Sequence, residues 1–172
     1  MNKLYYSPGA CSLAAHIVLE WTGEAYEAVK VDFHALPADF AWINPAGAVP
    51  ALDHGGARAL TQCAAILTYL ARTHPDLDLL DDRLPEHAAE LTRWTSFLTG
   101  GVHPAFWPVF MPGRYTKATD RASLNAVREA GFDIVRAKLG LLEAQLGSTR
   151  RCIRNDVVCS RIRQWRFHAA PT

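Results

Sequence analysis

The sequence lacks a long hydrophobic run, and this absence excludes a membrane-spanning helix. Charged residues, glycine or proline interrupt the apolar runs within about ten residues, whereas a helix needs about 20 apolar residues to cross a bilayer. The chain leads directly into a strand-like run at Leu4–Tyr6, without the apolar core and cleavage site of a secretory signal. We therefore expect a cytoplasmic protein.

The chain also has few cysteines and a small net charge. The four cysteines among 172 residues are too few and too scattered for a disulfide scaffold, and their spacings match no zinc site. The formal net charge of +1 argues against nucleic acid as the main partner. We therefore expect cytosolic thiols rather than disulfides, and no bound metal.

Hydrophobic and turn patterns divide residues 1–76 into strands and helices of a definite order. Apolar positions recur at helical spacing from Cys11, and Gly23 stands where a left-handed cap ends a helix. The predicted elements are a strand at Leu4–Tyr6, a helix from Cys11, a strand at Ala28–Val31, a helix-containing connection at Asp32–Asn44, strands at Val49–Leu52 and Arg58–Leu60, and a helix around Ile66–Leu70. The order βαβ-α-ββα, with a parallel first strand pair, is that of a thioredoxin-like α/β domain.

Residues 85–149 show helical periodicity without strand signals. One apolar face is formed by Leu91, Trp94, Leu98 and Val102, and we expect Pro104, Pro108 and Pro112 to break this helix. A second stripe is formed by Val127, Gly131, Val135, Leu139, Leu142 and Leu146. We therefore predict a thioredoxin-like domain at 1–76, a linker at 77–84 and a partial all-α domain at 85–149.

Four segments carry a resemblance to a known family: Tyr5–Leu13, Asn44–Leu52, Leu60–Leu70 and Trp94–Phe106. In their order and spacing they resemble the Beta class of bacterial glutathione S-transferases. The resemblance implies that glutathione is the co-substrate, that residues 1–76 bind it, and that the chain forms a homodimer. It also implies a detoxifying transferase activity of the EC 2.5.1.18 type.

Cys11 is the first candidate catalytic residue. It follows a Ser-Pro-Gly turn at the start of a helix, where unpaired NH groups and the helix dipole favour an anion and lower a thiol pKa. The resemblance implies that Cys11 faces the glutathione sulfur and can form a mixed disulfide with it. A small buried thiol is the structural alternative. Ser12, otherwise a capping hydroxyl, and Tyr6, otherwise the end of a strand, are reserve candidates for activating the sulfur.

Two dipeptides are candidates for binding glutathione. Val49-Pro50 resembles the family's Val-cis-Pro, which implies that the Val49 main chain pairs with the extended tripeptide; a plain turn proline is the alternative. Gln62-Cys63 opens the last helix of the first domain, where the resemblance implies contact with the γ-glutamyl end. The family usually has an acid where Gln62 stands, so we expect weaker binding of the glutathione ammonium.

The resemblance implies further site residues in both halves of the chain. His103 would donate to the glutathione thiolate or relay its proton, unless it only caps a helix break beside Pro104. Ser96 and Gly100 match positions that line the glutathione pocket. His34 is a substitute for the family's basic contact to the glycyl end, which is not evident here. Several aromatic residues supply an apolar lining on the helical side, as core or as part of an electrophile pocket: Trp94, Phe97, Phe106, Trp107, Phe110 and Tyr115.

Residues 150–172 differ in composition from the rest of the chain. They contain six arginines but one acidic residue, Asp156, and no leucine or lysine. Because the family pattern stops at Gly147, we predict a frameshift near Arg150, or a truncation of the helical domain; a divergent natural C-terminus is the alternative. Loss of the covering helices would expose Val135 and Leu142.

Three functions remain open at this point. The first is a transferase that adds the glutathione thiolate to a small hydrophobic electrophile. The second is a glutathione-dependent thiol-disulfide reductase that works through a Cys11 mixed disulfide. The third is a glutathione-binding protein without catalysis, or a pseudoenzyme made so by the altered C-terminus. The apolar residues of the predicted pocket do not identify the electrophile.

Overall fold

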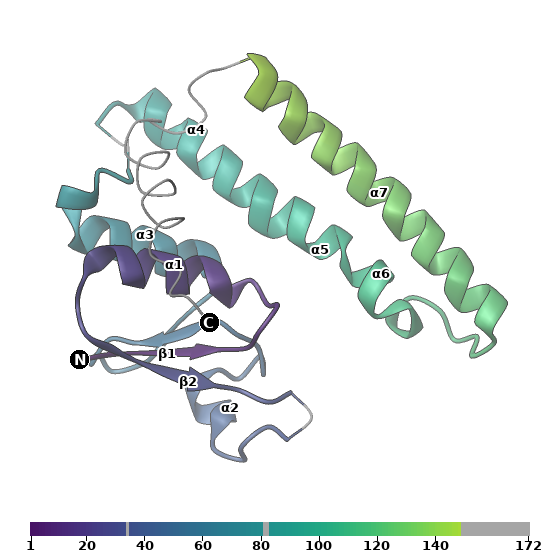
Figure 1. Cartoon of the computed structure of the whole chain (residues 1–172), viewed down its shortest axis with the longest axis horizontal. Helices are drawn as coiled ribbons and strands as arrows, with labels where there is room; N and C mark the ends of the chain where they lie inside the picture. The colour runs from purple at the N-terminus through teal and green to yellow at the C-terminus, as the bar shows by residue number, and fades with distance from the viewer. Residues whose placement is uncertain (34, 81–82, 149–172) are drawn as a thin grey trace, which may run out of the picture. The chain divides into compact units, whose positions relative to one another are not determined.

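The computed structural model describes residues 1–33, 35–80 and 83–148, which fall into two compact units (Figure 1). The division lies between Leu80 and Asp81, within the predicted linker, and the domain boundaries that we place at 76 and 85 stay predictions. Our expectation about residues 150–172 lies outside the described residues, as does His34. Among the described residues, no helix is both long and apolar enough to cross a membrane.

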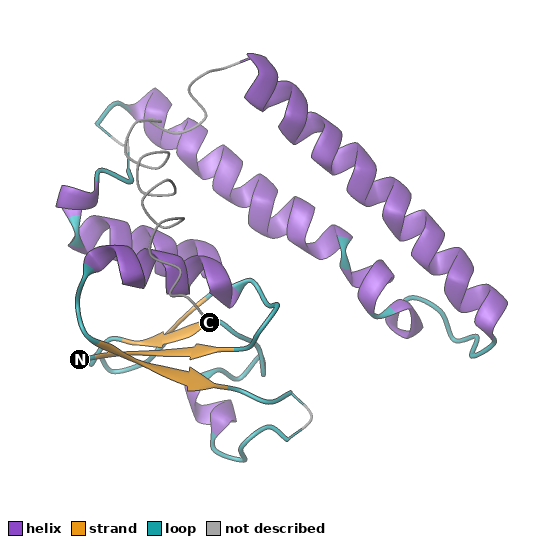
Figure 2. Ribbon diagram, in the orientation of Figure 1, coloured by secondary structure: helices purple, strands orange, loops and turns teal. Residues whose placement is uncertain are grey.

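The first unit has the predicted βαβ-α-ββα order (Figure 2). Its elements are β1 (Asn2–Tyr6), α1 (Ser12–Thr22), β2 (Tyr26–Lys30), α2 (Phe40–Ile43), β3 (Ala51–Asp53), β4 (Leu60–Thr61) and α3 (Cys63–Thr73), followed by the short 3-10 helix η1 (Pro75–Leu77). The four strands lie in the order β2-β1-β3-β4. β1 pairs parallel with β2 and antiparallel with β3, which confirms the thioredoxin-like α/β fold.

Successive side chains of β1 lie on opposite faces of the sheet and belong to different hydrophobic clusters. Leu4 is fully buried in the main core, which lies beneath α1 and α3. The next residue, Tyr5, points to the other face, where it packs against Phe40 of α2 with ring centroids 5.8 Å apart. Because successive side chains of a strand point to opposite faces, one short strand joins the two layers of the unit.

Local signals place the ends of the first-unit elements close to their predicted positions. Gly23 adopts the predicted left-handed cap, with φ of 71°, and its NH donates to the carbonyl of Glu20. The last strand is Leu60–Thr61 instead of Arg58–Leu60, because Ala51 and Leu52 of β3 pair with Thr61 and Leu60. The hairpin is therefore confirmed, with its second strand shifted along the chain.

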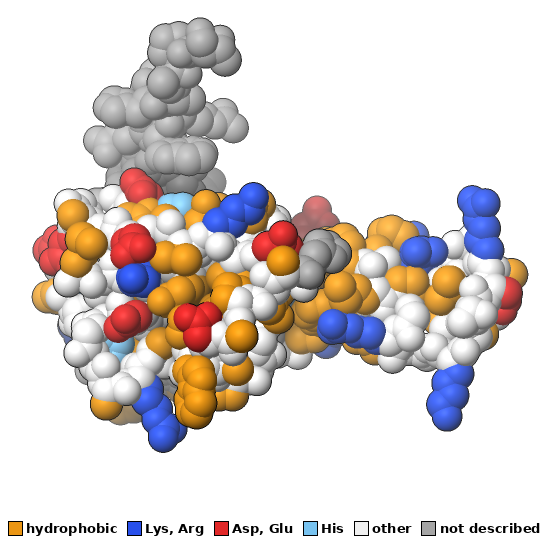
Figure 3. Space-filling view, turned by 90° about the horizontal axis from the view of Figure 1, so that it is seen from below, with side chains coloured by type: hydrophobic (Ala, Val, Ile, Leu, Met, Phe, Trp, Pro, Cys, Tyr) orange, Lys and Arg blue, Asp and Glu red, His pale blue; other side chains and the backbone are white. Residues whose placement is uncertain are grey.

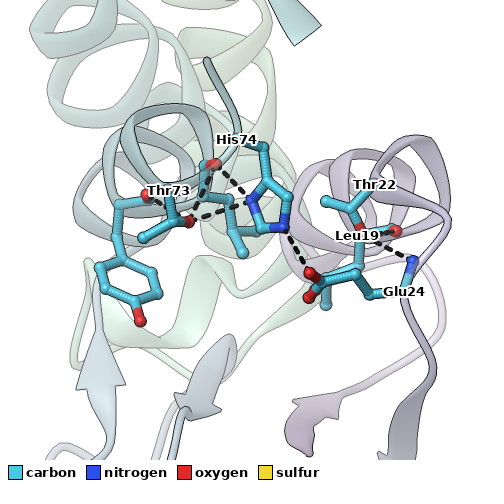
Figure 4. A network of polar contacts seen from close by, with 7 residues as sticks. Leu19, Thr22, Glu24, Thr73 and His74 are labelled. Carbon is cyan, nitrogen blue, oxygen red and sulfur yellow. Dashed lines mark hydrogen bonds and ion pairs between the residues drawn. The ribbon is translucent and has the colours of Figure 1, made fainter. Parts of the chain in front are cut away.

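A polar network joins the ends of α1 and α3 (Figure 4). The ring of His74, which follows α3, lies with Nε2 3.3 Å from the carboxylate of Glu24, and with Nδ1 2.9 Å from the carbonyl oxygen of Leu70. The backbone NH of Glu24 donates to the hydroxyl of Thr22 at 3.1 Å. These contacts hold the two helices at their C-terminal ends, away from the helix starts that carry the candidate site.

The face of the first unit that carries α2 displays hydrophobic side chains at its surface (Figure 3). Trp42 of α2 is 91% exposed, and Phe33 and Leu36 in the preceding connection are also exposed. Large apolar groups on a surface are typical of a contact with another protein.

Between residues 83 and 148 the second unit contains helices and the turns that join them, and no strand. Its elements are α4 (Pro85–Ser96), the π-helical turn η2 (Phe97–Val102), α5 (His103–Ala105), α6 (Trp107–Phe110), the 3-10 turn η3 (Pro112–Arg114) and α7 (Arg121–Ser148). The expected break at Pro104 is wrong, because Val102, His103 and Phe106 all keep right-handed helical dihedrals. Pro104 lies in the first turn of α5, where a missing NH is tolerated, directly after the π-helical turn.

The N-terminal half of α7 packs against α6. Gly131 permits the close approach: a Cβ atom there would lie 3.0 Å from Cβ of Pro108 and from Cγ2 of Val109. Val135 is only 6% exposed, so our expectation that it would be uncovered is wrong for this residue. Farther along the predicted stripe, Leu142 is half-buried and Leu146 is exposed.

Candidate functional site

The turn between β1 and α1 presents Cys11 at the start of the helix. Gly9 takes a positive φ of 75°, which lets the chain reverse, and the NH of Ala10 donates to the carbonyl of Ser7 at 3.2 Å. Cys11 occupies the N-cap position, and α1 continues for 11 residues from Ser12. The half-buried thiol thus lies beside the positive end of a helix, which favours an anion.

Ser12 holds this turn together. Its side chain is fully buried. The hydroxyl of Ser12 donates a hydrogen bond to the carbonyl of Ser7 and accepts one from the NH of Ser7, and each of the two hydrogen bonds is 3.2 Å long. With its hydroxyl used in this way, Ser12 acts on the shape of the turn rather than on a ligand. Tyr6, the other reserve candidate, ends β1 and packs its ring against His16.

Replacing Ser12 with alanine is expected to lower the free energy of unfolding by about 1–3 kcal/mol, because the NH and the carbonyl of half-buried Ser7 both lose their partner. Urea unfolding followed by circular dichroism measures the change. The matched substitution is Ser96→Ala at an exposed serine of α4, for which we expect a change within about 0.5 kcal/mol. Equal effects of the two substitutions would contradict this role for Ser12.

The Val49-Pro50 segment lies directly against Cys11. The peptide bond is cis, as the resemblance implies, and the Cys11 thiol donates to the carbonyl of Val49 at 3.6 Å. Asn44, which we missed as a positioning residue, is buried ahead of this segment. Its amide donates to the carbonyl of Ala48 at 2.6 Å, and its side-chain oxygen accepts from the NH of Ala46 at 3.1 Å. The Asn-Pro-Ala-Gly run is a turn signal that points to this role.

Gln62 and Cys63 begin α3 beside the same turn. Gln62 has φ of 70° and ψ of 122°, a conformation that costs a residue other than glycine about 1–3 kcal/mol. Its side chain is exposed and makes no capping hydrogen bond to the helix. Such strain persists only where the surrounding structure imposes it, and it is frequent at ligand sites.

The Cys63 side chain reaches back to Cys11. Its thiol donates to the carbonyl of Cys11 at 3.6 Å. The pKa of Cys63 is raised far above its ordinary value, first by the hydrogen bond to the Cys11 side chain, then by burial, and then by the charge of that neighbour. The structure thus brings together Cys11, Val49 and Cys63 from three segments separated along the chain.

The remaining candidates belong to the second unit. His103 is exposed at the start of α5, with its ring edge-on to Trp107 at 6.2 Å. Ser96 is the exposed last residue of α4, and Gly100 lies in the π-helical turn, where a Cβ atom would meet nothing within 4 Å. The local structure therefore leaves all three accessible to a ligand.

The aromatic residues of this unit divide between packing and exposure. Trp94 and Phe97 contact each other edge-on at 5.6 Å, and Phe106 stacks on Phe110 at 5.8 Å. Phe110 is nevertheless 72% exposed. The group therefore combines half-buried and surface members.

Comparison with known proteins agrees with this fold and these motifs. The family model described as "Glutathione S-transferase, N-terminal domain" matches residues 2–72. A glutathione S-transferase of Xanthomonas campestris is 47% identical over 111 residues, which cover 63% of this chain and 53% of that protein. The chain thus spans about half the length of this curated relative.

Solved structures extend the similarity into the helical unit. A bacterial beta class glutathione S-transferase of Sphingomonas chungbukensis is 39% identical with a TM-score of 0.69, covering 84% of this chain and 69% of that one. A sphingomonad glutathione S-transferase complexed with glutathione is also 39% identical, with a TM-score of 0.69 and coverage of 84% and 70%. The chain belongs to the bacterial, beta-class-like glutathione S-transferases.

Proposed function

We propose that this chain binds glutathione in its first unit and transfers the glutathione thiolate to a small hydrophobic electrophile. The observation that carries the proposal is the convergence of Cys11, the Val49 main chain and the start of α3 at one end of the sheet. The related sphingomonad enzyme was solved with glutathione bound, which supports the same ligand here.

The proposed binding mode uses the main chain more than side chains. The extended tripeptide pairs with the main chain of Val49, which precedes β3, as a peptide adds to a sheet edge. Its γ-glutamyl carboxylate lies at the start of α3, an 11-residue helix whose first NH groups point toward an anion. The exposed amide of Gln62 accepts a hydrogen bond from the γ-glutamyl ammonium.

The proposed chemistry takes place at the sulfur. The start of α1, at Cys11, favours a thiolate over a thiol. The glutathione thiolate attacks the electrophilic carbon, so that a carbon–sulfur bond forms and the leaving group departs with its electron pair. His103 is proposed to relay the proton released by the thiol, and Ser96, Gly100 and His34 to line the pocket.

Gln62 tests the proposed contact with the ammonium. Gln62→Glu is expected to tighten glutathione binding about fivefold, since a carboxylate adds about 1 kcal/mol to a hydrogen bond with a cation. Gln62→Ala is expected to weaken binding, because it removes the acceptor. Isothermal titration calorimetry measures both constants. If both variants bind like the wild type, Gln62 does not contact the ligand.

Retention on immobilised glutathione, followed by an assay with an aryl halide, tests the function itself. A transferase elutes with free glutathione and forms the thioether. Retention without thioether formation, and without reduction of a mixed disulfide, would instead indicate a binding protein without catalysis. A chain that does not bind the resin would contradict the proposal, provided that circular dichroism shows it to be folded.

A thiol-disulfide reductase is the second candidate, and the contact between Cys63 and Cys11 specifically favours it. Glutathione and 2-hydroxyethyl disulfide exchange to give the mixed disulfide of glutathione and 2-mercaptoethanol, and the reduction of this mixed disulfide measures the activity. We also propose a homodimer, for which the exposed apolar side chains around Trp42 are the supporting observation. Gel filtration with light scattering measures the oligomeric state.

A further inference from the structure

Two thiols meet at the candidate site, and the transferase reaction needs only one of them. Cys11 begins α1 and Cys63 begins α3, and both side chains are half-buried in the structure. Sγ of Cys63 lies 3.6 Å from the carbonyl oxygen of Cys11, to which it donates a hydrogen bond. A disulfide requires two cysteines that lie close together, and the starts of α1 and α3 place these two beside each other.

The partial burial of the pair matters for its chemistry. A fully buried thiol is inert, whereas a thiol at a helix start that a small molecule can reach is open to exchange with disulfides. Cys11 meets both conditions, because it lies at the N-cap of α1 and is half-buried. Cys63 lies behind it and contacts it, as a resolving thiol does.

We propose that Cys11 and Cys63 form an intramolecular disulfide, with glutathione disulfide as the oxidant, and that this bond closes the glutathione site. The proposal goes beyond the proposed transferase function, since it requires the two thiols and a small disulfide but no electrophile. It assigns to Cys63 a redox role that a hydroxyl at the same position cannot take.

The reaction proceeds in two exchanges. The Cys11 thiolate attacks one sulfur of glutathione disulfide; a bond forms between Cys11 and that sulfur, and one glutathione thiolate leaves. The Cys63 thiolate then attacks Sγ of Cys11, so that the Cys11–Cys63 bond forms and the second glutathione thiolate leaves. The two protein thiols are oxidised, one glutathione disulfide is reduced to two glutathione molecules, and the two protons pass to the departing thiolates.

The positions of the two thiols favour this order. Cys11 lies at the N-cap of α1, where the helix dipole favours a thiolate, whereas the pKa of Cys63 is raised by its hydrogen bond to Cys11, by burial and by the charge of that neighbour. Cys11 is therefore the first nucleophile and Cys63 the second.

The expected consequence is a site that glutathione cannot use. The bond uses the thiol of Cys11, which the proposed function places opposite the glutathione sulfur, and it joins the starts of α1 and α3. Two molecules of glutathione reverse the reaction through the same mixed disulfide. The ratio of glutathione to its disulfide therefore sets the fraction of protein that binds substrate.

Mass spectrometry of the full chain tests this inference. The protein is incubated with glutathione disulfide, alkylated, and digested with trypsin without reduction. We expect peptide 4–30, which contains Cys11, to be joined to peptide 59–72, which contains Cys63, with the loss of two hydrogens. In Cys63→Ser the reaction should stop with glutathione on Cys11, and in Cys11→Ser the linked peptide should be lost.

The outcomes separate this inference from the proposed function. The inference would be overturned if the wild-type protein ended with glutathione on Cys11 and with Cys63 alkylated. It would also be overturned if Cys11 became linked to Cys152 or Cys159 as often as to Cys63. Repeating the oxidation with 2-hydroxyethyl disulfide distinguishes the two proposals, because it needs no glutathione site. Linkage with this reagent, together with no retention of the reduced chain on immobilised glutathione, would contradict the binding proposal alone. Loss of retention after oxidation, restored by dithiothreitol, is expected if both hold.

Discussion

Replacing Cys11 with alanine is expected to abolish the mixed disulfide with glutathione and all thiol-disulfide reductase activity. The reason is chemical, because Cys11 is the sulfur that would form the covalent intermediate, and alanine offers no nucleophile. Thioether formation is expected to persist at a reduced rate, since the Val49 main chain and the start of α3 still bind glutathione in the proposed mode. Mass spectrometry and the two activity assays, on wild type and variant, measure these effects.

The matched control for this experiment is Cys63→Ala, which removes the neighbouring thiol and leaves Cys11 in place. This control is expected to form the mixed disulfide and to accumulate it, because no second thiol resolves it. If Cys11→Ala still becomes modified by glutathione within residues 1–80, then Cys63 is the reactive thiol and our assignment is reversed. If thioether formation is also abolished in a folded variant, Cys11 is required for the transfer itself.

Leu4→Ala is expected to lower the free energy of unfolding by about 2–5 kcal/mol, the range for truncating a buried leucine. Leu4 is 0% exposed in the middle of β1, where it contributes to the core beneath α1 and α3. Its loss leaves a cavity between the sheet and the two helices whose starts carry the candidate site. Denaturant unfolding measured by circular dichroism, together with glutathione retention at rising temperature, should show the change.

Leu13→Ala is the matched control for this prediction, since Leu13 is 61% exposed on α1. Its effect is expected to stay within about 0.5 kcal/mol, because little apolar surface is lost from the core. A loss at Leu4→Ala as small as that expected for Leu13→Ala would show that the first unit does not fold around Leu4.

Local interactions explain why the element order was predictable. Gly23 ends α1 because a left-handed cap requires little more than the absence of a side chain. The single strands and helices of the first unit follow from apolar spacing and turn residues, both of which act over a few positions. The motif around Cys11 was identified in the same way, since the turn and the helix start adjoin it in the chain.

The path of the second unit was less predictable. Proline usually ends a helix, but here the π-helical turn leads directly into α5, and the backbone stays helical through Pro104. Likewise, the pattern along α7 identified Val135 as apolar without identifying its partner. The close approach of α7 to α6 at Gly131, one turn earlier, is a feature of the packed unit that the pattern along α7 does not show.

The sequence by itself determined the thioredoxin-like order, the helical second unit and the choice of Cys11, because each depends on neighbours within a few residues. Only the tertiary structure decided that Cys63 reaches Cys11. The thiol of Cys63 and the carbonyl of Cys11 are 52 positions apart in the chain. Packing of α1 and α3 on one sheet brings the two groups together, and a pattern of neighbouring residues cannot predict a contact over that separation in the chain.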